Sequence, residues 1–104
     1  VLIAYGSAAR SALHVVKSRR MRGERLGILE LQTLWPFPAG IVRETCAGAK
    51  SVIVVEMNMG QILQEVKKAV DDPENVFLAN RIDGVFINPD DILQILRLIQ
   101  GKGV

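Results

Sequence analysis

The sequence predicts an α/β domain, a three-layer α/β/α sandwich on four parallel strands. Short apolar segments alternate with amphipathic ones in the order β-α-β-α-β-α-β-α along the chain. The apolar segments do not alternate with polar residues, as strands with one solvent-exposed face do. Continuous apolar strands are typical of parallel sheets that are covered on both faces. Right-handed crossovers would place helices on both faces. We expect one domain over residues 1–104, with strand order 2-1-3-4.

The first half of the chain contains two expected strands and two expected helices. VLIAYGS, residues 1–7, is a short apolar strand ending in Gly-Ser, and LGILEL, residues 26–31, is the second strand. Between them a helix runs to about Met21, and Gly23 can end it. Its apolar face is formed by Ala9, Ala12, Leu13 and Val16. A second helix spans about residues 39–49 and places on one face Val42, Thr45, Cys46 and Ala49.

The second half repeats the alternation. SVIVVE, residues 51–56, is the clearest buried strand, and VFLAN, residues 76–80, is the fourth. The helix between them is ended by DDPEN and carries the apolar residues Ile62, Leu63, Val66, Ala69 and Val70. In the last helix, Asn88 is the expected N-cap, Pro89 takes the first helical position, and two aspartates complement the helix dipole. The buried stripe of that helix comprises Ile92, Ile95, Leu96 and Ile99.

Composition narrows the function classes. With 49% apolar and 23% charged residues the chain is globular, and a net charge of +2 with 5% aromatic residues does not favour nucleic acid. We expect the basic run KSRRMRGER, residues 17–25, to be a solvated helix end and loop, with Lys17, Arg19, Arg20 and Arg22 in solvent. No apolar run approaches the ~18 residues of a membrane span. The lone Cys46 permits neither an internal disulfide nor a thiolate cluster, so we expect a reducing, cytoplasmic location.

A ligand or partner is expected at the carboxyl ends of the first and third strands. In open parallel sheets, sites form where the strand order reverses, which for order 2-1-3-4 lies between these two strands. The turns that meet there are YGSAAR, Tyr5–Arg10, and EMNMGQ, Glu56–Gln61.

The first turn offers weak anion-binding chemistry. Gly6 and Ser7 at a helix start supply backbone amides and a hydroxyl, and Arg10 could add a positive charge. No glycine-rich dinucleotide or phosphate-loop motif is present. The interpretation we favour is that Ser7 caps the helix while Gly6 permits a tight turn.

The second turn resembles a catalytic site in position only. Glu56 could act as a general base, but no proton partner or metal ligand stands beside it. Asn58 and Gln61 are hydrogen bonders, and Gly60 suits close backbone approach or a positive φ. His14, the only histidine, lies within a helix, so no Ser-His-Asp triad is predicted. We therefore predict no catalytic residue and no metal ligand, and we expect Glu56 to pair with neighbouring donors or another subunit.

The phosphorylated receiver domains that share this strand order are also excluded. They need an acidic cluster at the ends of the first and third strands, and here the first strand ends in Tyr5-Gly6.

The segment TLWPFP forms a stiff apolar knob at the end of the second strand. Pro36 and Pro38 fix the backbone on which Trp35 and Phe37 are carried. Two interpretations stay open: a small core under the loop, or an interface anchor that loses little entropy on docking.

The same residues carry a family resemblance over nearly the whole chain. YGSAAR, G-ILELQTLWPFP, VIVVEMNMGQILQEVK and RIDGVFINPDDIL resemble, in order and spacing, the carboxyl-terminal part of the alpha subunit of 2-oxoacid:ferredoxin oxidoreductases. The most specific pieces are TLWPFP and the pattern of Glu56, Asn58, Gly60 and Gln61. Support comes from Asp83, Gly84 and Pro89.

The resemblance implies a transketolase carboxyl-terminal-like fold, with an antiparallel edge strand expected before Val1 and a longer parent chain. Such enzymes convert a 2-oxoacid and coenzyme A to an acyl-CoA and CO2 and reduce ferredoxin. They use thiamine diphosphate, magnesium and iron–sulfur clusters, which the resemblance assigns to other domains. The expected partners are the rest of the alpha subunit and a beta subunit, with ferredoxin and coenzyme A acting on the whole complex.

The resemblance therefore predicts a non-catalytic, structural docking domain. One alternative is the equivalent domain of a transketolase or of a 2-oxoacid dehydrogenase E1-beta-type enzyme, although those usually carry another pattern at residues 36–38. An alternative of a different class is a stand-alone module that binds a small anion at the Gly6-Ser7 turn.

Overall fold

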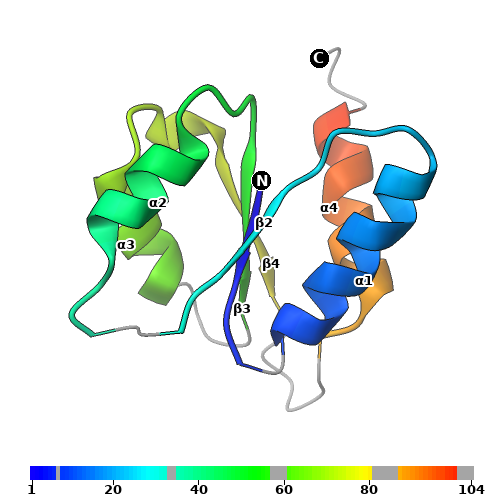
Figure 1. Cartoon of the computed structure of the whole chain (residues 1–104), viewed down its shortest axis with the longest axis horizontal. Coiled ribbons are helices and arrows are strands. Elements are labelled where there is room, and N and C mark those ends of the chain that lie inside the picture. The colour runs from blue at the N-terminus through cyan, green and yellow to red at the C-terminus, as the bar shows by residue number, and fades with distance from the viewer. Residues whose placement is uncertain (7, 33–34, 57–60, 81–86, 101–104) are drawn as a thin grey trace.

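The structure is a three-layer sandwich around one parallel sheet (Figure 1). The computed structural model describes residues 1–6, 8–32, 35–56, 61–80 and 87–100. Its strands are β1 (Leu2–Ala4), β2 (Ile28–Glu30), β3 (Val52–Glu56) and β4 (Val76–Asn80). They lie in the order β2-β1-β3-β4, and each neighbouring pair is parallel. The predicted fold class and strand order are confirmed, while the antiparallel edge strand expected before Val1 stays a prediction.

Two helices cover each face of the sheet (Figure 1). The helices α1 (Ala8–Met21) and α4 (Pro89–Gln100) lie on one side, and α2 (Ala39–Cys46) and α3 (Gln61–Ala69) lie on the other. The reason is the direction of the connections between strands. The connection through α1 runs toward the β2 edge of the sheet, whereas those through α2 and α3 run toward the β4 edge. Right-handed crossovers in opposite directions place their helices on opposite faces. A short 3₁₀ turn, Pro73–Asn75, precedes β4. None of the described helices has the length and apolar character needed to span a membrane.

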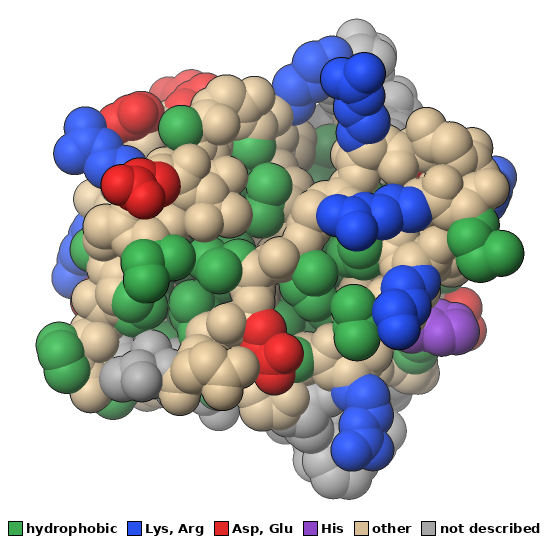
Figure 2. Space-filling model, in the orientation of Figure 1, with side chains coloured by type: hydrophobic (Ala, Val, Ile, Leu, Met, Phe, Trp, Pro, Cys, Tyr) green, Lys and Arg blue, Asp and Glu red, His purple; other side chains and the backbone are tan. Residues whose placement is uncertain are grey.

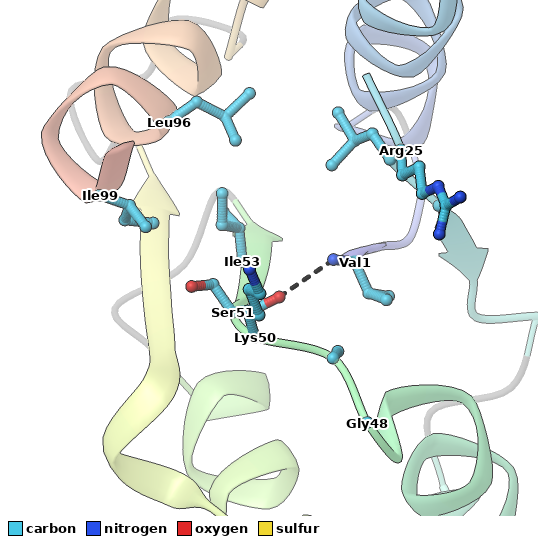
Figure 3. Close-up of a pocket in the computed structure, with 11 residues that line it drawn as sticks. Val1, Arg25, Gly48, Lys50, Ser51, Ile53, Leu96 and Ile99 are labelled. Atoms are coloured by element: carbon cyan, nitrogen blue, oxygen red, sulfur yellow. Dashed lines mark hydrogen bonds between the residues drawn. The ribbon is translucent and has the colours of Figure 1, made fainter. Parts of the chain in front are cut away.

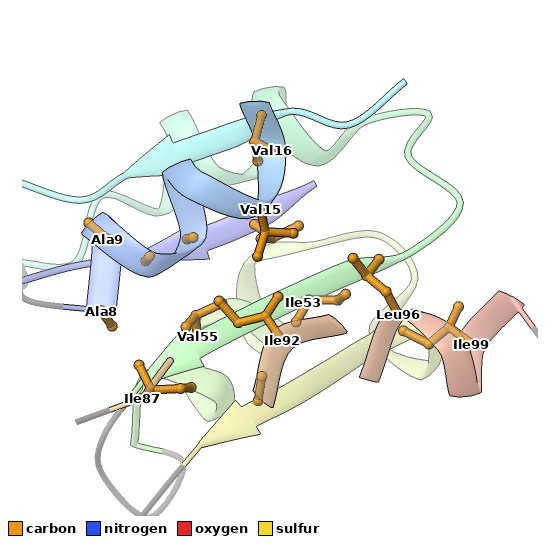
Figure 4. Packing of buried hydrophobic residues seen from close by; sticks show 14 residues of the cluster. Ala8, Ala9, Val15, Val16, Ile53, Val55, Ile87, Ile92, Leu96 and Ile99 are labelled. Atoms are coloured by element: carbon orange, nitrogen blue, oxygen red, sulfur yellow. The ribbon is translucent and has the colours of Figure 1, made fainter. Parts of the chain in front are cut away.

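The core consists of two apolar layers separated by β3. All five residues of this strand are buried, and successive side chains point to opposite faces. Ile53 and Val55 pack with residues of α1 and α4, including Val15, Ile92 and Leu96 (Figure 4). The alternate residues of β3 enter the layer under α2 and α3. That second layer includes Val42, Val52, Val54, Ile62 and Val66.

The predicted helix ends at Gly23 and Asn88 are confirmed. Gly23 has φ +84°, and the amides of Gly23 and Glu24 donate to the last carbonyls of α1 in a Schellman pattern. At the start of α4, the Asn88 Oδ1 accepts from the amide of Asp91 at 3.2 Å. The Asp91 carboxylate accepts in return from the amide of Asn88 at 2.9 Å.

Two side chains of α1 differ from the prediction. Leu13 is exposed by 41%, because the buried stripe runs through Ala8, Ala12, Val15 and Val16, and Leu13 falls beside it. Arg19, predicted to be solvated, is 7% exposed because it continues that stripe. The Arg19 Nη1 donates to both carboxylate oxygens of Glu24, at 3.0 and 3.2 Å, while its Nε has no partner among the described residues. The basic run is therefore only partly solvated.

The helix α2 is shorter than predicted. It ends at Cys46 because Ala47 adopts ψ 126° and Gly48 adopts φ +79°, neither of which continues a helix. Ala49 consequently lies outside the helix, and Thr45 is exposed. Val42 and Cys46 are the buried residues of α2.

We expect the substitution Ile92→Ala to destabilise the protein that contains this chain by about 2–5 kcal/mol. The Ile92 side chain is fully buried between α4 and the sheet, so its truncation leaves a cavity. The matched control is Leu98→Ala on the same helix, where the side chain is 63% exposed. Its effect should stay within about 0.5 kcal/mol. Chemical denaturation measures both, and equal losses would contradict the packing described here.

Candidate functional site

The structure brings the two predicted turns to one edge of the sheet. Ala4 of β1 is in register with Val55 of β3, so these two strands end side by side. Gly6 has φ +60°, and its carbonyl accepts from the amide of Ala9 at 3.2 Å, which forms a tight turn into α1. Gly6 therefore has the conformational role that the sequence favoured. The candidates Ser7, Asn58 and Gly60 lie outside the described residues.

The polar candidates on these turns do not converge on one point. Glu56 follows the alternation of Val52 and Val54 and so faces the layer of α2 and α3. Arg10 is exposed on α1, which covers the opposite face. Gln61 is exposed as the first residue of α3. The described candidates therefore lie at the same edge but on different sides of the sheet.

The carboxylate of Glu56 is bound to the start of α3. The side chain has 0% exposure, Oε2 accepts from the amide of Leu63 at 3.0 Å, and Oε1 accepts from the amide of Ile62 at 3.4 Å. These amides belong to the first turn of α3, where no intrahelical acceptor exists for them. The negative charge of the carboxylate also interacts favourably with the positive end of the helix dipole. Glu56 thus caps the helix that follows its own strand, and the buried carboxylate is unavailable to a solvent-borne substrate.

The described residues do not fit a bound metal or iron–sulfur cluster. No group of three or more His, Cys, Asp or Glu side chains within the described ranges could hold a metal ion. The Cys46 thiol is buried on α2, and this burial raises its pKa, which favours the protonated form over a thiolate.

The segment around Trp35 is both anchored and exposed. Phe37 is half-buried and packs against the layer beneath α2, whereas Trp35 is 64% exposed and is joined to Pro36 by a cis peptide bond. Pro38 is half-buried and Pro36 exposed. Phe37 therefore agrees with the interpretation of TLWPFP as a small core, whereas the exposed Trp35 agrees with the interpretation as an interface anchor.

The chain segment that carries Trp35 is uncharged. No charged residue occurs from Leu31 to Val42, and Ile41 at the start of α2 is 57% exposed. Figure 2 shows apolar side chains gathered over this side of the molecule, between α2 and the β2 edge. Exposed apolar side chains of this kind mark contact surfaces more often than catalytic sites.

A pocket that the sequence did not predict lies at the opposite, amino-terminal end of the strands (Figure 3). It has a volume of about 560 Å³ and two cationic residues, Arg25 and Lys50, in its wall. Across it, the nitrogen of Val1 donates to the carbonyl of Ser51 at 3.0 Å. Gly27 and Gly48 also line the pocket, but the described glycines outside it have equally open surroundings, so the sequence held no signal for this pocket. The other lining residues are Leu26, Ala49, Ile53, Leu96 and Ile99.

Comparison with known families gives a match over most of the chain. The family model for the pyruvate:ferredoxin oxidoreductase core domain II matches residues 1–92. The KorA subunit of 2-oxoglutarate synthase from Methanothermobacter marburgensis is 38% identical over 92 residues, which are 88% of this chain and 24% of that subunit. The VorB subunit of ketoisovalerate oxidoreductase from the same organism is 39% identical over 102 residues, 98% of this chain and 29% of that one. The chain thus spans about a quarter of the length of the curated relatives it matches.

A solved structure shares the fold. The 2-oxoglutarate:ferredoxin oxidoreductase from Magnetococcus marinus, with 2-oxoglutarate, coenzyme A and succinyl-CoA bound, superposes with a TM-score of 0.82. The match covers 93% of this chain and 17% of that chain at 20% identity. At this identity the likeness describes the fold alone.

We expect Glu56→Ala to destabilise the protein by about 2 kcal/mol, because two buried amides of α3 lose their acceptor. Glu56→Gln should lose less, since the amide oxygen can still accept one of these hydrogen bonds. Glu44→Ala, at an exposed position on α2, is the control and should change the free energy of unfolding by less than about 0.5 kcal/mol. Urea denaturation of the three variants measures the effects. A Glu56→Ala variant with full stability but no enzyme activity would indicate a catalytic carboxylate instead.

Proposed function

This chain belongs to the core domain II family of pyruvate:ferredoxin oxidoreductases, and from that premise we propose that it is a non-catalytic docking domain of an oxidoreductase alpha subunit. The resemblance read from its motifs is confirmed at the level of the family. The match sets aside the equivalent domains of transketolases and 2-oxoacid dehydrogenases. What the domain does within its enzyme is the subject of the proposal.

The parent enzyme is proposed to oxidise a 2-oxoacid and join its acyl group to coenzyme A. The products are an acyl-CoA and CO2, and the two electrons released pass to ferredoxin. Support comes from the names of the relatives, which include a 2-oxoglutarate synthase and a ketoisovalerate oxidoreductase. The family resemblance assigns thiamine diphosphate, magnesium and iron–sulfur clusters to other domains and subunits, and the described residues form no group that could hold a metal ion. The partners are therefore the rest of the alpha subunit and a beta subunit.

The observation that carries the docking role is the position of the Glu56 carboxylate. It lies at the carboxyl end of β3, where a ligand of a parallel sheet is expected, and its two oxygens are bound to the start of α3. By contrast, the side chains of Trp35 and Ile41 on the uncharged segment are exposed. A buried acid that stabilises a helix, together with exposed apolar side chains, favours a role in contacts with other domains or subunits over catalysis. We also place the enzyme in the cytoplasm, where a single free cysteine stays reduced.

A second candidate function is binding of a small anion at the turn that precedes α1. The positive φ of Gly6 and the exposed guanidinium of Arg10 favour it. Saturable binding of inorganic phosphate by the 104-residue chain, lost in Arg10→Ala, would support it. The docking role predicts no saturable phosphate binding.

The 104-residue chain alone should show no 2-oxoacid-dependent reduction of ferredoxin, because its sequence has no cofactor-binding motif and its described residues form no group that could hold a metal ion. The assay supplies the 2-oxoacid, coenzyme A, thiamine diphosphate and magnesium, and the complete enzyme is the positive control. Measurable turnover by the purified chain would sink the proposal of a non-catalytic domain.

We expect Trp35→Ser in the complete alpha subunit to weaken assembly with its partners by about tenfold or more, because exposed aromatics are enriched among interface hot spots. Leu98→Ser is the matched control, since Leu98 is 63% exposed on α4 and Trp35 is 64% exposed. Analytical ultracentrifugation of the subunits gives the dissociation constants. Unchanged assembly of the Trp35→Ser enzyme would remove Trp35 as an anchor.

A further inference from the structure

We propose that the outer face of α1 and the loop after it form a second docking surface, which binds an acidic surface on another subunit of the same enzyme. This inference rests on the proposed function as a subunit domain. The surface, called the basic face below, consists of Arg10, Lys17, Arg20, Arg22 and Arg25.

Positive charge is strongly concentrated on this part of the chain. Six of the 13 basic and one of the 11 acidic residues lie between Ala8 and Leu29, so that segment carries +5. The whole chain carries +2, which leaves −3 on all the other residues. Figure 2 shows the Lys and Arg side chains gathered over α1 and the segment that follows it. Although the net charge of the chain is small, its positive charge is therefore concentrated on one segment.

The one acid of the segment does not neutralise the basic face. Glu24 binds the buried Arg19, which is not part of that face. All five cations of the basic face are exposed, and the three ion pairs found among the described residues involve the other cations Arg19, Arg43 and Lys68. Uncompensated like charges at close range disfavour the isolated fold, so their concentration on one helix and loop points to a complementary partner.

The basic face is held in place before a partner arrives. The ion pair of Arg19 with Glu24 and the bond from the Glu24 amide to the Arg19 carbonyl at 3.1 Å fix the loop against the end of α1. That loop carries Arg22 and Arg25. In addition, the Arg20 Nε donates to the carbonyl of Leu26 at 2.7 Å. A preorganised set of arginines loses less conformational entropy on binding.

The chemistry of the face fits a protein better than a nucleic acid or a membrane. Leu13 is 41% exposed and Met21 is 89% exposed, and both lie among the cations on α1. Arginine and methionine are enriched in protein interfaces. The sequence from Ala8 to Leu29 contains no Phe, Trp or Tyr to form a row of stacking platforms for bases. The apolar stripe of α1 is turned to the sheet, so it is unavailable for insertion into a lipid surface.

The test is a double charge reversal, Arg10→Glu with Lys17→Glu, in the complete alpha subunit. The matched control reverses two exposed cations on the other layer, Arg43→Glu with Lys68→Glu, whose exposed ion pairs contribute little to stability. Dissociation constants for assembly with the purified partner subunits are measured by analytical ultracentrifugation at low and high salt. Thermal unfolding of each alpha subunit verifies that the variants are folded.

We expect the Arg10/Lys17 variant to assemble about tenfold or more weakly at low salt, with the control unchanged. The wild-type affinity should fall as salt is added, and the variant should lose most of this dependence. Equal affinities for the wild type and the Arg10/Lys17 variant would overturn the inference while leaving the proposed function intact.

Two further outcomes distinguish a failure of the proposed function from a wrong choice of partner. If the wild-type parent protein neither assembles with partner subunits nor oxidises a 2-oxoacid, the proposed function fails, and the inference falls with it. If a single-stranded DNA oligonucleotide or phosphatidylserine vesicles bind the wild type but not the Arg10/Lys17 variant at physiological salt, the assignment to a protein partner is overturned.

Discussion

The organisation of the molecule depends on β3, a strand with neighbours on both edges and an apolar layer on each face. Its pairing with β1 and β4 satisfies its backbone, and its five side chains are buried without exception. A strand of this kind requires helices on both sides of the sheet, because neither face can be left to water. The last residue of β3 places a carboxylate in the core, where it needs hydrogen-bond donors. The start of α3 provides the amides that Glu56 needs, so the end of the strand and the beginning of the helix are stabilised by the same contact.

Because of this contact, Glu56 lies where a ligand-binding site is expected but its carboxylate is not free to bind a ligand. The edge of the sheet where β1 and β3 end is where parallel α/β domains usually bind ligands. In this chain, however, the described polar groups at that edge lie on different faces, and the buried acid is bonded to backbone amides. Two other groups of exposed side chains are the apolar residues Trp35 and Ile41 and the cations of the basic face. Both kinds suit association with proteins, which agrees with a chain that spans about a quarter of its relatives' length.

Much of the fold was predictable because its determinants are local. Apolar periodicity located the four strands and four α-helices that the structure describes, although not the short 3₁₀ turn Pro73–Asn75. Gly23 and Asn88 marked helix ends, and the right-handed crossover rule converted the element order into the strand order. Errors occurred where the rotation of a helix about its axis decides exposure. Leu13 and Val15 are both apolar residues of α1, and periodicity alone did not distinguish which one meets the sheet. Arg19 was assigned to solvent from its charge, but the turn at Gly23 brings Glu24 back to pair with it inside the fold.

For the candidate site, the sequence by itself determined which turns meet and which chemistries are excluded. A single histidine, a single cysteine and the lack of a phosphate-loop motif are properties of composition, so they hold in any conformation. The partner of the Glu56 carboxylate, the projection of Trp35 beside the half-buried Phe37, and the pocket at the opposite edge were decided only by tertiary structure. Each depends on distances between residues that the chain brings together by crossing the sheet or by turning into the next helix. Local propensity fixes the elements, whereas the packing of one element on another fixes what each side chain contacts.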